Sequence, residues 1–250
     1  MAQEPLAGLM VAGNRLSPEI VDSIKAASAS TGVDFDFLVA QATVESGLRG
    51  TVHARQRHST AAGLFQFNAQ TWLRMMRAHG AENGHGDLAG QIVTLANGHL
   101  GIVDRAAEKQ LLDLRQDTRL SAIMAGELAR QNGQALQKAL HRKAQPTELH
   151  LAHLLGATGA IRFLRARSAD ATQSAAGVVP AAAKQNPQLF FDRGDHTPST
   201  VAAVYGKIKN RIETPLKQLA AATRSVAVAD RLRPGPGLTD ALPRKRGERV

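Results

Sequence analysis

The stretch that decides the fold runs from Val44 to Phe67 and reads VESGLRGTVHARQRHSTAAGLFQF. It contains a single acidic residue, Glu45, and the next acidic residue along the chain is Glu82. The ionisable residues between these two are all basic: Arg49, His53, Arg55, Arg57, His58, Arg74, Arg77 and His79. The pattern isolates one carboxylate, so acid chemistry in this part of the chain would depend on Glu45.

The residues before Glu45 predict a helix over 34–46 that is closed by a glycine. Leu38, Gln41 and Ala42 share one side of this helix with Glu45, because they recur at helical spacing. A half-buried carboxyl without an anionic neighbour has a raised pKa and can donate a proton near neutral pH. The alternative is an ordinary solvated glutamate near a helix end.

Length and composition favour one sizeable helical domain with extensions. The chain has 250 residues, of which 43% are hydrophobic and only 4% aromatic, so the core must consist mainly of aliphatic side chains. Strand-forming residues are sparse, which favours helices. The chain contains no cysteine, which excludes disulfides, thiolate chemistry and cysteine-based zinc sites.

The formal net charge of +10 predicts attraction to a polyanion, which can be nucleic acid, an anionic membrane or the carboxylate-bearing cell wall. No nucleic-acid fold signature accompanies the basic end of the chain, so we expect no nucleic-acid partner. No apolar run approaches the roughly 20 residues of a membrane span. The start of the chain does not resemble a signal peptide, because it lacks a basic region before a short apolar run.

Hydrophobic periodicity and the positions of glycine, proline and charged residues divide the chain into four parts. We expect a mobile leader over 1–16, a catalytic domain over 17–168, a connector with a helical extension over 169–222, and a basic disordered tail over 223–250. The helices expected are 17–32, 34–46, 69–79, 88–98, 104–115, 117–132, 134–143, 146–156, 159–168 and 199–213.

A second motif follows the isolated glutamate at a short distance. Residues 59–72 read STAAGLFQFNAQTW, and Glu45-Ser46 precedes them at the end of the predicted helix. The two motifs together resemble the soluble lytic transglycosylases of the lysozyme-like superfamily. Their signatures are a Glu-Ser pair that ends a helix and a Gly-Leu-x-Gln-hydrophobic sequence that follows a serine, here Ser59. The resemblance covers about residues 17–168 and implies a mainly α, lysozyme-like domain with a small loop or hairpin region beside a cleft.

The third signature of the family, Ala-Tyr-Asn-Ala-Gly, has a divergent counterpart at 152–156, AHLLG. His153 stands where the tyrosine is expected, and Leu154 replaces the asparagine. This departure resembles a branch of the family that carries Ala-His-hydrophobic-Leu-Gly. It alters the usual tyrosine contact to the catalytic acid but leaves the acid itself in place.

The resemblance implies cleavage of the bond between N-acetylmuramic acid and N-acetylglucosamine. Glu45 would protonate the glycosidic oxygen and then take a proton from the muramic 6-hydroxyl, which closes a 1,6-anhydro ring without water. One residue acts as acid and then as base, a contribution of about 10²–10⁴-fold. No cofactor is implied. The substrate implies a periplasmic or cell-envelope location, and export would use a secretion or flagellar apparatus or release by lysis.

Other residues of the motifs are expected to support Glu45. Ser46 either hydrogen-bonds substrate or caps the helix end, and Gln66 would bind an N-acetyl group. Gly63 would let the backbone approach the glycan. Phe65, or Phe67 after it, either stacks on a sugar or lies in the core. We also expect His153 to be a cleft residue.

Three other functions compete with the transglycosylase hypothesis. A lysozyme-type muramidase would use water and give a product heavier by one water. A non-catalytic wall-binding or assembly factor would not need an intact Glu45. A basic helical nucleic-acid-binding protein would leave the paired motifs unexplained. Metal binding is disfavoured, since the histidine pairs His150–His153 and His79–His85 lack a third well-spaced ligand.

Overall fold

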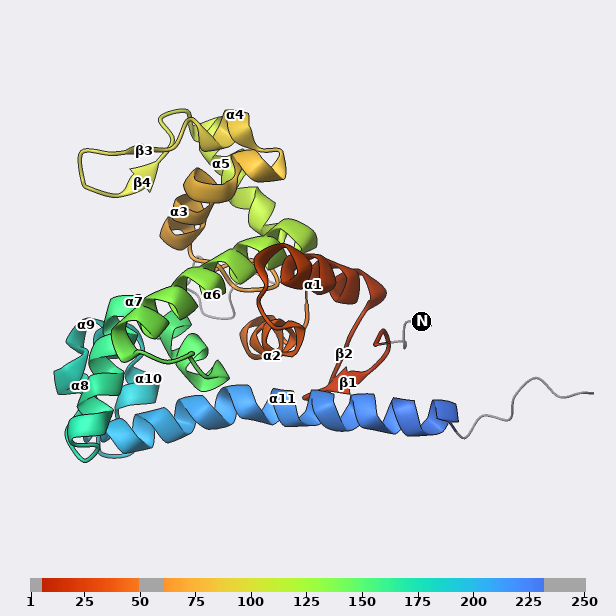
Figure 1. Cartoon of the computed structure of the whole chain (residues 1–250). Coiled ribbons are helices and arrows are strands. Elements are labelled where there is room, and N and C mark those ends of the chain that lie inside the picture. The colour runs from red at the N-terminus through yellow and green to blue at the C-terminus, as the bar shows by residue number, and fades with distance from the viewer. Residues whose placement is uncertain (1–5, 50–60, 232–250) are drawn as a thin grey trace, which may run out of the picture.

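The computed structural model describes residues 6–49 and 61–231 and is mainly α, as predicted (Figure 1). The helices are α1 Pro18–Thr31, α2 Phe35–Ser46, α3 Ala69–His79, η1 Ala81–Asn83, α4 Gly86–Ala89, α5 Arg105–Asp113, η2 Leu114–Gln116, α6 Thr118–Leu140, α7 Pro146–Ala169, α8 Ala175–Val178, α9 Pro180–Gln185, α10 Pro187–Phe190 and α11 Val201–Arg231. Two antiparallel hairpins accompany them, β1 Met10–Val11 with β2 Asn14–Arg15, and β3 Val93–Thr94 with β4 Leu100–Gly101. Within the described ranges no helix is long and apolar enough to span a membrane.

The helix that carries Glu45 begins and ends where its sequence predicts. Asp34 is the N-cap of α2 and accepts a hydrogen bond from the backbone N–H of Phe37 at 2.9 Å. Gly47 ends the helix in the left-handed conformation, with φ of 65°. The helix is buried along most of its length, so Glu45 near its end is held against the core and not in open solvent.

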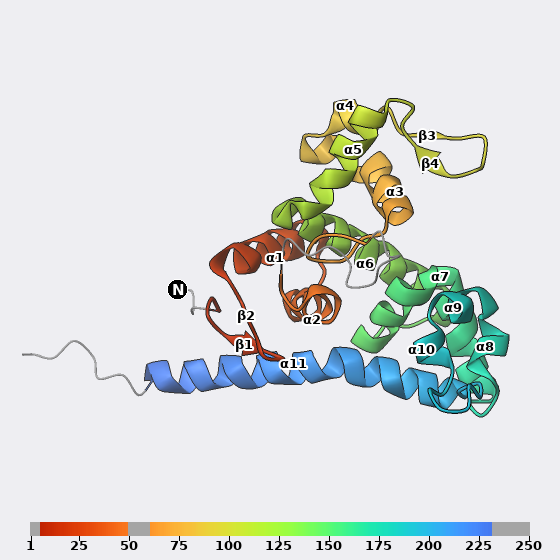
Figure 2. The same ribbon diagram turned by 180° about the vertical axis from the view of Figure 1, so that it is seen from behind.

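Two hydrophobic clusters form the core, and α6 crosses between them. The first contains the buried faces of α1, α2, α3 and α6. The second contains α7 to α10 and the start of α11. Helix α11 contributes to both, with Ile208 in the second cluster and Ile212 and Leu219 in the first. Figures 1 and 2 show α11 running along one side of the molecule past α2 and α7.

The helices expected over 88–98, 117–132 and 134–143 are wrong in their bounds. Helix α6 continues through Gly133, which was expected to end it; the position lies against Leu149 of α7, and packing outweighs a cost of about 1 kcal/mol for glycine in a helix. The helix expected over 88–98 is also wrong, since α4 ends at Ala89 and β3–β4 form a hairpin instead. Gly98 has φ of 78° in this turn, a backbone conformation that ends a helix.

Both ends of the described chain are more ordered than the sequence predicts. Residues 6–16 were assigned to a mobile leader, but Val11 and Leu16 are fully buried and the N–H of Ala12 donates to Gln218 of α11 at 2.7 Å. Helix α11 was expected to end near residue 213 but runs to Arg231, so 223–231 are helical and not part of a disordered tail. The apolar face of α11 packs on the first cluster as far as Leu219, which explains why the helix continues beyond residue 213. Residues 1–5 and 232–250 lie outside the described chain.

Candidate active site

Glu45 and His153 form the centre of the site. Glu45 is the second-last residue of α2, and His153 lies in α7. Oε1 of Glu45 lies 3.2 Å from Nε2 of His153, and each side chain is 17% exposed. The structure thus brings the predicted acid and the predicted cleft histidine into direct contact, although 107 residues separate them in the sequence.

Gln41 fixes the orientation of the His153 ring from the other side. It lies one helical turn before Glu45, and its Nε2 lies 2.9 Å from Nδ1 of His153. With its nitrogen towards Nδ1 the amide donates to a neutral ring whose proton is on Nε2, facing Glu45. A ring that carries a proton on Nδ1, as an imidazolium does, donates there instead, and the Gln41 carboxamide then turns over to accept through Oε1. Gln41 is only 2% exposed, and its Oε1 has no hydrogen-bond partner among the described residues.

The pKa of Glu45 is lowered, which corrects the prediction of a raised value. Burial raises the pKa of Glu45, but the charge and hydrogen bond of His153, together with the charges of His150 and Arg211, lower it further. Burial lowers the pKa of His153, and the Glu45 charge and hydrogen bond raise it above its usual value. The prediction considered burial alone, because nothing local in the sequence shows that α7 and α11 bring cations to Glu45.

His150 extends the site without adding a charge at neutral pH. It is fully buried, and its ring is stacked on that of His153 with centroids 6.0 Å apart and planes 9° apart. Burial lowers the pKa of His150 to about 4, against an opposing effect from the Glu45 charge. Neither ring nitrogen has a hydrogen-bond partner in the described part of the chain. His150 therefore supports the His153 ring as a neutral, flat surface.

A groove of about 680 Å³ opens beside His153. Its lining comes from α3, α6, α7 and α9: Asn68, Thr71, Arg74, Leu128, Gln131, Asn132, Ala152, His153, Leu154, Leu155, Gly156, Ala157, Thr158, Ala181, Ala182 and Gln185. Gly156 has φ of 70° and ψ of 160°, a conformation essentially restricted to glycine, and it breaks α7 into two halves at the groove. The divergent motif at 152–156 thus forms one wall of this groove.

Three residues of the first two motifs have structural positions. The hydroxyl of Ser46 donates to the Ala42 carbonyl and accepts from the Arg49 N–H, so it caps the end of α2. Phe65 is fully buried, so its side chain belongs to the core and stacking on a sugar is wrong for it. A Cβ added to Gly63 would lie 1.8 Å from the Arg115 carbonyl oxygen, so the close approach that requires glycine is to the protein's own backbone.

Gln66 and Phe67 lie at the end of the same loop. Gln66 has φ of 47°, is partly exposed, and donates from Nε2 to the Gly63 carbonyl at 2.9 Å. Its contact with an N-acetyl group stays a prediction. Phe67 is buried and packs edge-to-face on Trp72, with ring centroids 5.3 Å apart, so it too is a core residue. Ser59 lies outside the described residues.

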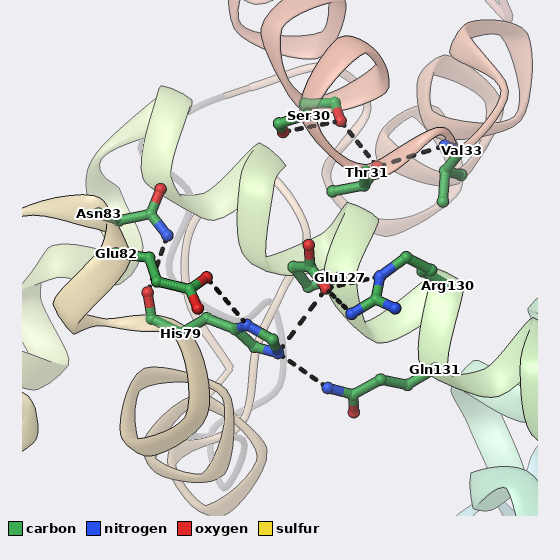
Figure 3. Close-up of polar contacts among 10 residues, drawn as sticks. Ser30, Thr31, Val33, His79, Glu82, Asn83, Glu127, Arg130 and Gln131 are labelled. Carbon is green, nitrogen blue, oxygen red and sulfur yellow. Dashed lines mark hydrogen bonds and ion pairs between the residues drawn. The ribbon is translucent and has the colours of Figure 1, made fainter.

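A separate polar cluster joins α3 to α6 next to the groove (Figure 3). Gln131 donates from Nε2 to Nε2 of His79 at 2.9 Å, and the carboxylates of Glu82 and Glu127 each lie 3.7 Å from the His79 ring. Arg130 donates to Glu127 at 2.6 Å. In the described chain no group of three or more His, Cys, Asp or Glu side chains is arranged to hold a metal ion. Because Gln131 lines the groove and bonds to His79, the cluster holds α3 and α6 together at one wall of the groove.

Sequence reasoning missed two residues of the site. The spacing of Gln41 places it beside Glu45, but its hydrogen bond with His153 depends on the packing of α7 and was not predicted. Arg211 lies in α11 and had no signal, because only tertiary packing brings its charge to Glu45. A comparison of the chain with models of known protein families finds no match. The function of this chain must therefore be inferred from the Glu45–His153 pair, its neighbours and the groove beside it.

Proposed function

We propose that this protein is a peptidoglycan lytic transglycosylase in which Glu45 acts first as acid and then as base. One observation supports the proposal above all others, the 3.2 Å contact between Glu45 and His153 at the edge of the groove. An acid that donates one proton and then takes up another alternates between its neutral and ionised forms, and a neighbour that exchanges protons with it supports both forms. His153 is such a neighbour, because an imidazole accepts and releases protons near neutral pH.

The pair holds one dissociable proton over the pH range between the lowered pKa of Glu45 and the raised pKa of His153. In the free protein this proton is on His153, and the two groups form an ion pair. A glycan that fills the groove expels water, and loss of water penalises separated charges. The neutral pair then becomes favourable, so the proton moves from Nε2 of His153 to the Glu45 carboxyl.

The cleavage step uses this proton on the glycosidic oxygen. Rotation of the carboxyl about its Cγ–Cδ bond turns the O–H from His153 towards the glycan. The bond between the anomeric carbon and the glycosidic oxygen breaks as the oxygen takes the proton, and the N-acetyl group of the substrate stabilises the developing cation. Glu45 is left as a carboxylate and forms its ion pair again only when a proton returns.

Ring closure restores the starting state. The Glu45 carboxylate accepts the proton of the muramic 6-hydroxyl while that oxygen bonds to the anomeric carbon. One carbon–oxygen bond has broken and one has formed, the proton is back on the pair, and no water has been consumed. Arg211 lowers the pKa of Glu45 through its charge and so favours the carboxylate that the second step needs.

No second acid lies beside Glu45 among the described residues, which supports a lyase over a hydrolase. A retaining glycosidase has its two carboxyls about 5–5.5 Å apart, and an inverting one about 6.5–9.5 Å apart. The side chains whose charges shift the pKa of Glu45 are His153, His150 and Arg211, and no described carboxylate is among them. None of the described residues that line the groove is acidic either. Intramolecular attack by the substrate's own hydroxyl does not require a second acid.

Mass spectrometry of muropeptides released from purified peptidoglycan tests this proposal. A transglycosylase releases 1,6-anhydro products that are lighter by one water than those of a muramidase. Hydrated products would replace the proposal with hydrolysis, and no release under varied pH and salt would replace it with a non-catalytic wall-binding role. The proposed substrate puts the protein in the periplasm or cell envelope, with a secretion or flagellar apparatus as the proposed export partner.

A further inference from the structure

Two polar side chains in the groove have no role in the acid–base pair. Arg74 on α3 is exposed, lines the groove, and makes no hydrogen bond or ion pair with any residue that the structure describes. Asn132 on α6 lines the same groove and is only 7% exposed, yet its carboxamide makes no hydrogen bond within the described chain. The polar atoms of Asn132 are not among the fully buried unpaired atoms, so they open to the groove and can bond a ligand that displaces water there.

The charges that line the groove indicate the charge of a ligand that would bind there. Its described lining contains no aspartate or glutamate, whereas Arg74 is a permanent cation and His153 is cationic in the free pair. The break at Gly156 also begins a new helical segment, 157–169, whose first residues line the groove. Helix starts present unpaired N–H groups and a positive partial charge. All of these features favour an anionic group and disfavour a cation.

We propose that this groove is a carboxylate-binding site, in which the guanidinium of Arg74 and the carboxamide of Asn132 hold an acidic group of the wall strand. A guanidinium presents paired N–H donors that match the two oxygens of a carboxylate, and a carboxamide adds one more donor. A neutral sugar would satisfy Asn132 but would leave Arg74 without a matching charge. The inference rests on the proposed function, because that function supplies the wall strand as the ligand.

The site lies beside the reacting bond. His153 both lines the groove and contacts Glu45, so a carboxylate held by Arg74 and Asn132 sits on the same strand that meets the acid. Two wall groups have the required chemistry, the carboxylates of the peptide stem and the lactyl carboxylate that is exposed when the stem is removed. Both are absent from an oligosaccharide of N-acetylglucosamine alone.

Binding measurements on the full chain carrying Glu45→Gln test the site without cleavage. Three soluble probes are titrated by calorimetry: wall strands with peptide stems, the same strands after an amidase has removed the stems, and an uncharged oligosaccharide of β-1,4-linked N-acetylglucosamine. Each is measured with Arg74→Gln, with Asn132→Leu and with the control Arg77→Gln. Arg77 is an exposed arginine of the same helix that does not line the groove.

Arg74→Gln should weaken binding of the strand that carries the recognised carboxylate, stem-bearing or stripped, by about tenfold or more, since a charge-assisted hydrogen bond is lost. Binding of the uncharged oligosaccharide should be unaffected. Asn132→Leu should act in the same direction, with circular dichroism confirming its fold. A loss confined to stem-bearing strands identifies a stem carboxylate. A loss confined to stripped strands identifies the lactyl carboxylate, because that group is an uncharged amide while the stem is attached. Arg77→Gln should change nothing.

Equal losses on the uncharged oligosaccharide, or equal effects of Arg74→Gln and Arg77→Gln, would overturn the carboxylate site. These outcomes are separable from failure of the proposed function. If the wild-type protein releases no anhydro product but Arg74→Gln selectively weakens binding of charged strands, the carboxylate site stands and the transglycosylase proposal fails. If anhydro product is released and Arg74→Gln has no selective effect, only the carboxylate site fails.

Discussion

His153 of α7 contacts Glu45 of α2 through Nε2 at 3.2 Å and Gln41 of the same helix through Nδ1 at 2.9 Å. The imidazole is therefore held at both nitrogens by residues one helical turn apart. A ring held in this way cannot rotate without losing both contacts. The Gln41 carboxamide can present either its nitrogen or its oxygen to Nδ1, so Nε2 faces the carboxylate in either protonation state. For the proposed reaction, this arrangement makes the proton content of the pair, and not the pKa of Glu45 alone, the quantity expected to set activity.

Replacement of Glu45 tests the assignment of the acid. Glu45→Gln keeps the size of the side chain but cannot donate a carboxylic proton, so glycan cleavage should fall by at least ~10²-fold with the fold intact. Release of anhydro muropeptides measures the effect. Glu82→Gln is the matched control, because Glu82 is 77% exposed and should tolerate the change. If the control lost activity and Glu45→Gln did not, Glu45 would not be the acid.

Replacement of His153 should shift the alkaline limb of the pH–activity profile to lower pH. In the wild-type pair the last proton leaves at the raised pKa of His153, above the usual 6.5, so activity is present below that pKa and lost as pH rises through it. In His153→Gln no imidazolium lowers the pKa of Glu45, so burial raises that pKa. Activity should then be lost as pH rises through the pKa of Glu45 itself. The profile of kcat/KM reports these values for the free enzyme.

At its new optimum His153→Gln should keep more activity than Glu45→Gln, because a carboxylic acid is still present. A limb that stayed at the wild-type position would show that His153 does not hold the catalytic proton. An NMR titration of the imidazole in the wild-type protein supplies an independent value of its pKa, and that value should match the alkaline limb.

Replacement of Gln41 should move the same limb in the opposite direction. Gln41→Glu puts a carboxylate at Nδ1 of His153, which stabilises the imidazolium and raises the pKa of His153 further. The proton then stays on the ring to higher pH and transfers less readily to Glu45, so the limb moves up and kcat falls. Gln41→Met keeps the volume without a charge and serves as control. An unchanged imidazole titration in Gln41→Glu would contradict this positioning role.

Replacement of Gly63 should destabilise the loop that precedes α3. Its φ of 78° strains any L side chain by about 1–2 kcal/mol, and a Cβ there would lie 1.8 Å from the Arg115 carbonyl oxygen. Gly98→Ala is the control, because Gly98 has the same φ with nothing within 4 Å of the added Cβ. The free energy of unfolding should fall more for Gly63→Ala than for Gly98→Ala. Equal losses would mean that the Arg115 backbone moves away at little cost.

Replacement of Glu148 should lower stability in a pH-dependent way. Glu148 is buried, accepts from Arg142 at 2.6 and 2.8 Å, and accepts from the N–H of Gln145 at 2.9 Å. Burial raises the pKa of Glu148, but these bonds lower it below the usual 4.5, so its stabilisation is present above 4.5 and is lost as pH falls through the lowered value.

Glu148→Gln should therefore cost about 1–3 kcal/mol at neutral pH and much less in acid. Denaturant unfolding across pH measures the difference. Glu213→Gln is the control, because its lysine partners Lys209 and Lys217 are exposed and such pairs contribute about 0–1 kcal/mol. A cost of Glu148→Gln that did not change with pH would show that the lost contacts are steric and not ionic.

From the sequence alone one predicts a mainly helical protein, the bounds of α2, and the candidate acid near the end of that helix. These features are local, because a cap such as Asp34, a stop such as Gly47 and an apolar stripe act within a few turns. The break of α7 at Gly156 is equally local, since a glycine ends the predicted helix there.

Tertiary structure alone decides the chemistry around the acid. The sign of the pKa shift of Glu45 depends on His153 and Arg211, which come from helices distant in sequence. The same holds for Gly63, whose constraint is the backbone of Arg115, and for α11, whose continuation beyond residue 213 follows from the core that it covers. Local patterns predict where a side chain lies along its own helix, whereas charge and contact depend on which helices pack together, and packing depends on the whole chain at once.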